Sequence, residues 1–198
     1  MYQKMLIVVA AATSVAASAY GQNGGSAAGD IPGVMPATAS FLPPGTTIKA
    51  TIDENLSTAN HEGEGVNLTV SENVMARDGS VAIPAGTMLQ GRLTGVHNAM
   101  AAGEPNVVRV DFNDLVLKGQ HYPFTGYVMS VMPKNPPAGS PTGNIVSAAD
   151  ASQLVSSGKL GAGAGTVIMM AKQVPGGDGI IGTGSVFTVR STSGIQVK

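Results

Sequence analysis

The alternation of apolar and polar residues predicts a chain made mostly of short β-strands. In residues 47–52, Ile48, Ala50 and Ile52 take one face and the polar residues between them take the other, and residues 66–71 repeat the pattern. A period of two is that of a strand with one buried face. Similar stretches predict strands at 81–83, 87–96, 107–117 and 121–131, and one or two strands in 184–198. We therefore expect an all-β fold, a small barrel or sandwich of about seven to nine short strands.

The longest of these stretches, residues 107–117, changes phase partway along. Val108, Val110 and Phe112 share one face, and after Asn113 Leu115 and Leu117 become the apolar set. Arg109 and Asp111 share the opposite face of the first part. A shift of one residue is what a β-bulge produces, because two residues of the bulged strand lie opposite one residue of its partner. We therefore predict a bulge between the two halves of this strand.

One short helix is predicted among the strands, at residues 147–157. Ser147 can cap its first turn, and Gly158 can end it. Residues 166–174 are apolar over so short a stretch that periodicity allows either a buried strand or a short helix.

A phrase rich in proline, glycine and threonine occurs twice, as LPPGTTIKATI at 42–52 and IPAGTMLQGRL at 83–93, with a weaker copy at 181–187. Proline cannot donate to a sheet ladder, and glycine takes the positive φ that a type II turn needs at its third residue. Each copy therefore predicts a corner that begins a new strand, with chance similarity in a chain of 27 Gly and 12 Pro as the alternative. Asp-Gly at 78–79 is a strong hairpin signal. The predicted structural turn residues are Pro43, Gly45, Asp78, Gly79, Pro84, Gly86 and Gly184.

The first residues have the layout of a secretory signal peptide. Lys4 precedes an apolar run, and Ala17 and Ala19 form an A-x-A cleavage site, with a cut after Gly21 as a second option. The alternative is an uncleaved anchor helix, but the run is shorter than the roughly 20 residues that a membrane span needs. We therefore expect a periplasmic or secreted protein with its signal peptide at 1–19.

The remaining chain divides into a linker and one domain. Residues 20–40 are small, polar and interrupted by proline, which predicts a flexible linker, with a first edge strand as the alternative. We expect a single β-barrel domain at 41–198 with a proline- and glycine-rich insertion at 132–165. No second apolar run approaches membrane length, so no transmembrane segment is expected in the mature chain.

Charge and cysteine content narrow the classes of function. Only 12% of residues are charged and the net charge is −1, so no basic stripe is present and nucleic-acid binding is not expected. The chain has no cysteine, which argues against a lipoprotein and against disulfides, so the exported fold depends on its core.

Four stretches resemble the C-terminal periplasmic β-barrel domain of the core scaffold family of type IV secretion and conjugation systems. They are PPGTTIKATIDENLST (43–58), VSENVMARDGSVAIPAGTMLQGRLTGV (70–96), RVDFNDLVLKGQHYPFTGYV (109–128) and GSVFTVRSTSGIQV (184–197). The resemblance implies the barrel fold and a location in the cell envelope. Scaffold proteins of that family also carry an inner-membrane helix and a helical hairpin that forms an outer-membrane pore. Neither has a counterpart here, so the resemblance is to a stand-alone exported form of the domain.

The sequence contains no recognisable catalytic, cofactor-binding or metal-binding motif. His61, His97 and His121 have no zinc-ligand spacing, and residues 111–114 lack the glycine and distal glutamate of a calcium loop. A weak metal site at 61–64 is the alternative to an ordinary solvated loop. We expect no cofactor, no metal and no enzymatic activity.

Three hypotheses of function follow, in order of preference. The first is an exported, non-catalytic module with a structural, scaffolding or protein-interaction role in the bacterial envelope, related to a secretion system. The second is a module that binds polysaccharide or peptidoglycan, with Tyr122, Phe124 and Tyr127 as the aromatic candidates. The third is a hydrolase with scattered carboxylates drawn from Asp53, Glu54, Asp111 and Asp114. The partners expected are envelope proteins or glycans, and the sequence does not indicate an oligomeric state.

Overall fold

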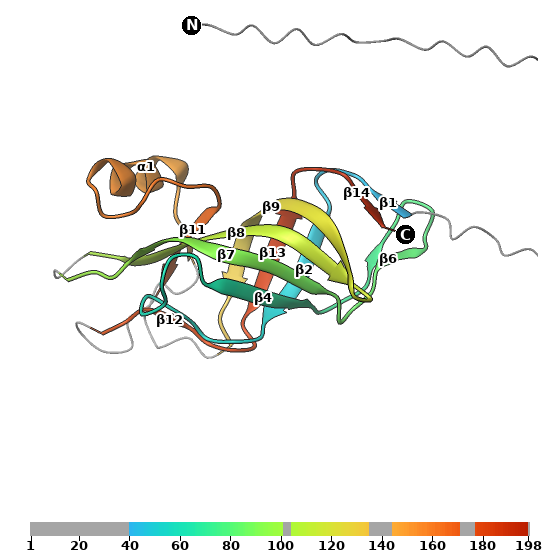
Figure 1. Cartoon of the computed structure of the whole chain (residues 1–198), viewed down its shortest axis with the longest axis horizontal. Helices are drawn as coiled ribbons and strands as arrows, with labels where there is room; N and C mark the ends of the chain where they lie inside the picture. The colour runs from blue at the N-terminus through green and yellow to red at the C-terminus, as the bar shows by residue number, and fades with distance from the viewer. Residues whose placement is uncertain (1–39, 101–103, 135–143, 171–176, 198) are drawn as a thin grey trace, which may run out of the picture. The chain divides into compact units, whose positions relative to one another are not determined.

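The computed structural model describes residues 40–100, 104–134, 144–170 and 177–197, which fold as an all-β structure around a closed barrel (Figure 1). The predicted signal peptide, its cleavage residues Ala17 and Ala19, and the linker up to residue 39 lie outside the described residues. The predicted all-β class is confirmed, and the architecture is a barrel rather than a sandwich.

Six antiparallel strands form the barrel. They are β2 (Thr47–Ile52), β4 (Gly65–Val70), β7 (Met88–His97), β8 (Asn106–Leu117), β9 (Gln120–Met132) and β13 (Val186–Ser191). Their order is β8-β7-β4-β2-β13-β9, and β9 pairs with β8 again to close the ring. Each of the six strands therefore pairs with a neighbour on both sides, and none of them is an edge strand.

Shorter strands surround the barrel in pairs. β1 (Ser40–Leu42) pairs with β14 (Ile195–Val197), β3 (Leu56–Ser57) with β12 (Ile180–Ile181), and β5 (Val74–Met75) with β6 (Val81–Ile83). β11 (Thr166–Met170) adds to the first half of β8, where β9 has moved away, and β10 (Asn144–Ile145) adds to β11. Thr166 of β11 still connects to β9 where the two strands diverge, because its Oγ1 accepts a hydrogen bond of 2.9 Å from the Val128 backbone N–H.

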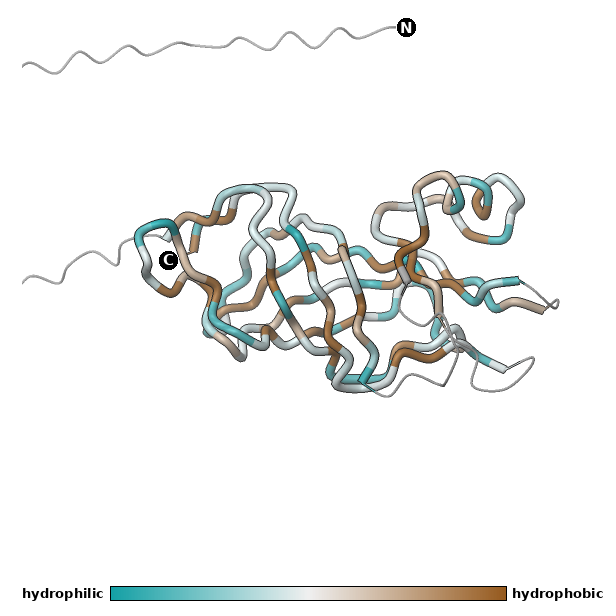
Figure 2. The backbone as a smooth tube through the Cα atoms, turned by 180° about the vertical axis from the view of Figure 1, so that it is seen from behind, coloured by the Kyte–Doolittle hydropathy of each residue, from teal (hydrophilic) through white to brown (hydrophobic). Residues whose placement is uncertain are grey.

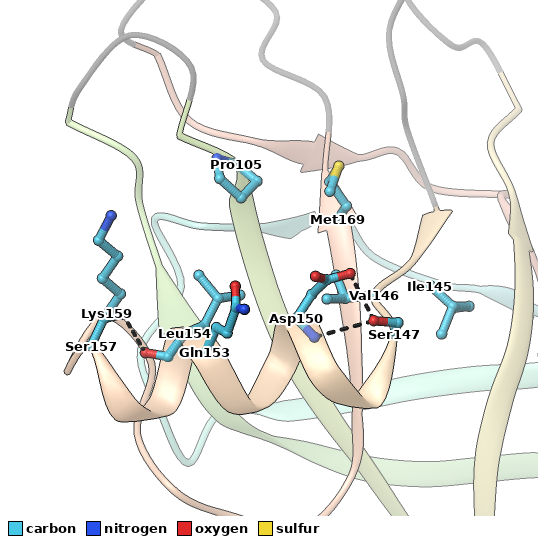
Figure 3. A pocket seen from close by; sticks show the side chains of 10 residues that line it. All are labelled: Pro105, Ile145, Val146, Ser147, Asp150, Gln153, Leu154, Ser157, Lys159 and Met169. Carbon is cyan, nitrogen blue, oxygen red and sulfur yellow. Dashed lines mark hydrogen bonds between the residues drawn. The ribbon is translucent and has the colours of Figure 1, made fainter.

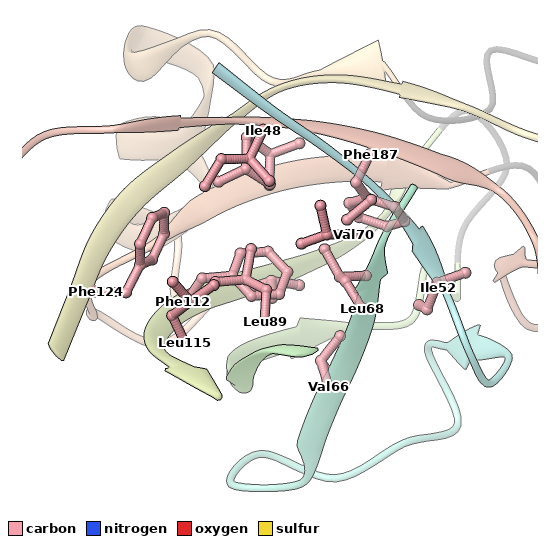
Figure 4. Packing of buried hydrophobic residues seen from close by; sticks show 14 of the residues in the cluster. Ile48, Ile52, Val66, Leu68, Val70, Leu89, Phe112, Leu115, Phe124 and Phe187 are labelled. Atoms are coloured by element: carbon pink, nitrogen blue, oxygen red, sulfur yellow. The ribbon is translucent and has the colours of Figure 1, made fainter. Parts of the chain in front are cut away.

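The core fills the barrel with the inward residues of all six strands, as the alternation predicts. Along β2, β4 and β13 every second residue is buried, and Figure 2 shows the matching alternation of hydropathy along the backbone. Ile48, Leu68, Leu89, Phe112, Leu115, Phe124 and Phe187 are each at most 1% exposed and pack together (Figure 4). Burial of this apolar surface is the main force that stabilises the fold.

The bulge predicted in β8 is confirmed. The register of β8 shifts between Phe112 and Asp114 against β9, and at the same level against β7. Leu115 and Leu117 therefore return to the interior on the same side as Phe112. The bulge needs space beside it, because a Cβ added at Gly91 of β7 would lie 2.5 Å from the Asp111 carbonyl oxygen.

The three predicted corners have the same geometry. Gly45, Gly86 and Gly184 have φ of 86°, 86° and 80°. In each corner the Thr or Ser after the glycine donates its backbone N–H and its hydroxyl to the carbonyl three residues earlier, as Thr87 does to Pro84 at 3.3 and 2.8 Å. Each glycine N–H also donates to a carbonyl at the end of the neighbouring strand: Gly45 to Ser191, Gly86 to Val70 and Gly184 to Ile52. The corners thus begin one strand and fasten the end of another.

The hairpin at 78–79 joins β5 to β6. Gly79 has φ 83°, and its N–H donates to the Ala76 carbonyl at 3.1 Å. Asp78 Oδ1 accepts hydrogen bonds from the backbone N–H and the hydroxyl of Ser80. These bonds lower the pKa of the Asp78 carboxyl, so this aspartate belongs to turn structure.

The predicted helix is confirmed as α1 (Ala148–Ser156), with Ser147 as its N-cap. The ambiguous stretch forms strand β11 over residues 166–170, and residues 171–174 lie outside the described part. Both elements belong to the predicted insertion region or follow it directly.

Candidate interaction site: the α1 groove

α1 begins and ends with local hydrogen bonds that its sequence supplies. Ser147 Oγ accepts from the Asp150 backbone N–H at 3.1 Å and donates to Asp150 Oδ2 at 2.7 Å. These bonds satisfy one of the free amides of the first turn. At the other end Gly158 takes φ 71°, and its N–H donates to the Val155 carbonyl.

α1 rests on a small apolar cluster outside the barrel. Val107 of β8, Leu160 and Val167 of β11 are buried there, and Ala151, Leu154 and Val155 of α1 pack against them without being fully buried. Leu160 reaches this position because β7 has a glycine beneath it: a Cβ at Gly95 would lie 2.9 Å from Leu160 Cδ1. No residue of α1 is fully buried, whereas each barrel strand has at least three buried residues.

The segment after α1 is fastened to β7 and β8 by polar groups. The Arg109 guanidinium donates to the Gly161 carbonyl, and Thr94 Oγ1 donates to the Ala164 carbonyl at 2.6 Å. Arg109 lies on the outer face of β8, as its position predicts, yet is only 4% exposed because this segment covers it. Lys159 forms an ion pair with Glu104. The alternation of β8 could not indicate this cover, which comes from a distant part of the chain.

A groove of about 630 Å³ lies between α1, the strands β10 and β11, and Pro105 just before β8 (Figure 3). We call it the α1 groove. Its apolar lining is Pro105, Ile145, Val146, Leu154 and Met169, and its polar lining is Ser147, Asp150, Gln153, Ser157 and Lys159. A second hollow of about 480 Å³ lies on the other flank of the helix, over Arg109 and Val167. Three separate stretches of the chain build the α1 groove, which is why no single motif in the sequence pointed to it.

Four of the five polar side chains that line the α1 groove are engaged in structural bonds. Ser147 and Asp150 bond to each other at the cap, Ser157 Oγ donates to the Leu154 carbonyl at 3.1 Å, and Lys159 pairs with Glu104. In the described part of the chain, the hydrogen bonds of the two serine hydroxyls go to Asp150 and to the Leu154 carbonyl. An apolar cleft with a few polar groups at its rim suits non-covalent binding.

Of the three histidines, His61 and His121 contribute nothing to the lining of this groove, whereas His97 lies near it through Glu104, which pairs with Lys159. His61 contacts Glu64 at 3.1 Å, His121 contacts Asp114, and His97 Nε2 lies 4.0 Å from Glu104 Oε2. Across the described ranges, no three His, Asp or Glu side chains gather closely enough to hold a metal ion.

The candidate carboxylate pair is not assembled either. Asp53 follows β2 and accepts hydrogen bonds of 2.9 Å from Thr69 Oγ1, whereas Asp111 and Asp114 lie on β8. β2 and β8 are separated by β4 and β7 on one side of the ring and by β13 and β9 on the other, so they lie on opposite walls of the barrel. Glu54 follows Asp53 and lines a small hollow near Glu64.

Glu64 completes a turn rather than a reactive site. Its carboxylate accepts hydrogen bonds from the His61 backbone N–H at 2.9 Å and from Asn60 Nδ2 at 2.6 Å. These bonds, the backbone one first, hold the pKa of the Glu64 carboxyl below its ordinary value. The 61–64 segment is thus a capped surface loop.

The three aromatic candidates for glycan binding do not form one platform. Phe124 is 1% exposed and belongs to the core, Tyr122 is half-buried with its hydroxyl bonded to Gln120, and Tyr127 is exposed on the outer face of β9.

Comparisons with known proteins give a likeness to solved structures but no match in sequence. No model of a known protein family matches the chain, and no curated protein sequence matches it. A solved structure that resembles it is that of ComB10 of the Com type IV secretion system of Helicobacter pylori, with a TM-score of 0.43 and 14% sequence identity over 79% of this chain and 90% of that one. So distant a likeness carries no information on function. No helix in the parts of the chain that the structure covers is long and apolar enough to cross a bilayer.

Proposed function

We propose that this protein is an exported, non-catalytic β-barrel module of the bacterial envelope that binds another envelope protein through the α1 groove. In this role the barrel is a rigid platform and α1 is the adjustable element. The observation that carries the proposal is the α1 groove itself, an apolar cleft in which four of the five polar side chains help to hold its walls. The signal-like start of the chain and the resemblance of its strands to the secretion scaffold barrel support the location in the envelope.

The occupant expected is a short apolar segment of a protein partner. The lining offers five apolar side chains, and the exposed flank of α1 lies along the cleft, so a peptide would be covered from two sides (Figure 3). Recognition would come from burial of apolar side chains, which contribute about 25 cal/mol per Å².

The test is site-specific crosslinking in the cells that produce the protein. A photoreactive residue at Gln153, which lines the groove, is expected to capture one envelope protein, and the same residue at Arg77, exposed on the β5–β6 turn, is not. Met169→Glu places a carboxylate on the groove wall and is expected to reduce capture at least tenfold while the melting temperature stays close to that of the unaltered chain.

Equal capture from Arg77, or undiminished capture in Met169→Glu, would show that the groove is not the binding site. Groove-dependent retention on a peptidoglycan array would favour the glycan-binding hypothesis instead. Turnover of a hydrolase substrate that Met169→Glu abolishes would favour an enzyme.

A further inference from the structure

The outer face of β9 carries a row of exposed apolar side chains that the barrel does not use. Tyr127, Met129 and Met132 are 43%, 44% and 71% exposed. Strict alternation would turn two residues three apart to opposite faces. Here the register of β9 against β13 shifts between Thr188 and Val189, and Met129 is the additional residue, so both methionines face outward. A bulge that re-aims side chains in this way is typical of functional surfaces.

Two basic side chains flank this row, one at each end of β13. Arg190 pairs directly with Tyr127 in the sheet, and its guanidinium lies over the Gly45 corner, 3.3 Å from where a Cβ would stand. The ammonium of Lys134 lies over the Gly184 corner at the same distance. Six residues of extended chain separate Gly184 from Arg190, which is about 20 Å at 3.3 Å per residue.

Neither cation has an anionic partner among the described residues. No carboxylate there lies within 4.0 Å of Arg190 or Lys134, whereas Lys49 on the neighbouring strand pairs with Glu72 at 3.1 Å. The combination of Tyr, Met and Arg is the composition enriched in the cores of protein interfaces.

We propose that this surface, the β9–β13 strip of Tyr127, Met129, Met132, Lys134 and Arg190, docks an extended acidic peptide segment of a partner protein. The segment would place one carboxylate on Arg190 and a second, about six residues away on the same face, on Lys134. Apolar side chains between them would lie on Tyr127 and the methionines. Residues two apart face the same way in an extended chain, so residues six apart do as well.

An anionic membrane fits the strip less well than a peptide does. Membrane surfaces attract clusters of four or more basic residues, with each contributing a small amount. The strip as defined here has two cations, Lys134 and Arg190, at opposite ends of an apolar row. The strip shares no residue with the α1 groove, so the inference stands whether or not the groove binds a partner.

The test uses two synthetic peptides and the whole protein in low salt. One peptide, Glu-Thr-Val-Thr-Val-Thr-Glu, has both carboxylates and both valines on one face, and the control peptide replaces each Glu with Gln. Amide chemical shifts followed during titration are expected to change in β9 and β13, with the Gln peptide binding about fivefold or more weakly.

Variants separate the strip from other surfaces. The double variant Arg190→Gln with Lys134→Gln is expected to bind the acidic peptide about fivefold more weakly, as is Met132→Ser. Lys49→Gln removes a cation that already has a partner, and Met169→Glu alters the α1 groove; both are expected to bind the peptide as the unaltered chain does. All five substituted positions are exposed or half-buried, so unchanged amide spectra would verify that each variant folds.

Three results would overturn the proposal: equal affinity for the two peptides, shifts confined to the α1 groove, or binding to phosphatidylglycerol vesicles with none to the acidic peptide.

Discussion

At the residue scale, the repeated phrase of the sequence acts as a set of strand clamps. Each corner forms two backbone hydrogen bonds with the end of a neighbouring strand. At the second corner, Gly86 N–H donates to the Val70 carbonyl at 2.8 Å, and Val70 N–H donates to the Thr87 carbonyl at 2.8 Å. The corners at Gly45 and Gly184 do the same between β2 and β13. The three copies thus have the same structural role: each one pairs the backbone groups at the end of a neighbouring barrel strand.

The corner at Gly86 gives the prediction at this scale. A Cβ at this position would meet nothing within 4 Å, so Gly86→Ala should destabilise the fold through backbone strain alone. An L-residue at φ near 86° costs about 1–2 kcal/mol, and Gly86→Asn should cost less because Asn tolerates positive φ. Urea denaturation would measure both. An alanine variant as stable as the unaltered chain would show that the corner is not held at this φ.

At the element scale, α1 is the part of the fold with the weakest support. Its apolar side chains pack on the buried trio of Val107, Leu160 and Val167, and hollows lie on both of its flanks. Regions with few buried apolar contacts open locally at lower free energy than the rest of a domain. This is the property expected of an element that adapts to a bound segment.

Hydrogen exchange tests this difference. Amides of α1 are expected to exchange faster than those of β4 and β7, and Leu160→Ala should accelerate α1 by tenfold or more while the barrel amides change little. The matched control is Leu93→Ala, the same substitution in the barrel core, which should accelerate exchange throughout the barrel. A uniform effect of both variants would mean that α1 and the barrel open as one unit.

The elements also show what the sequence could and could not predict. The alternation of apolar and polar residues predicted the barrel strands, and the change of its phase in β8 predicted the bulge. Ser147 predicted the start of α1. Each of these features depends on residues that are close together in the chain. The strand β11, the two-residue strands β3 and β12, and the cover over Arg109 depend on residues far apart. The α1 groove and the β9–β13 strip belong to this second kind.

At the scale of the whole molecule, the barrel closes where β8, β9 and β13 meet around Gly126. Gly126 pairs with Phe112 of β8 and with Ser191 of β13. Pairing partners across the closure are far apart in sequence, so closure could not be predicted from local patterns. The barrel closes because β9 pairs with both β8 and β13 at this residue.

Closure therefore predicts an unusual sensitivity at Gly126. An alanine Cβ would lie 2.6 Å from Phe124 Cε1 and 2.8 Å from the Arg190 carbonyl oxygen, and Phe124 is too deeply buried to move aside. Gly126→Ala should lower the free energy of unfolding by about 1–3 kcal/mol and the melting temperature by several degrees. Phe124→Leu in the same chain should recover part of the loss by making room for the methyl group. Gly182→Ala, whose Cβ would approach only Asn55 Oδ1 at 3.9 Å, is the control and should leave stability nearly unchanged. If Gly126→Ala and Gly182→Ala have the same melting temperature, the strands at the closure can move apart to admit a methyl group. The barrel would then not be the rigid platform assumed for both binding surfaces.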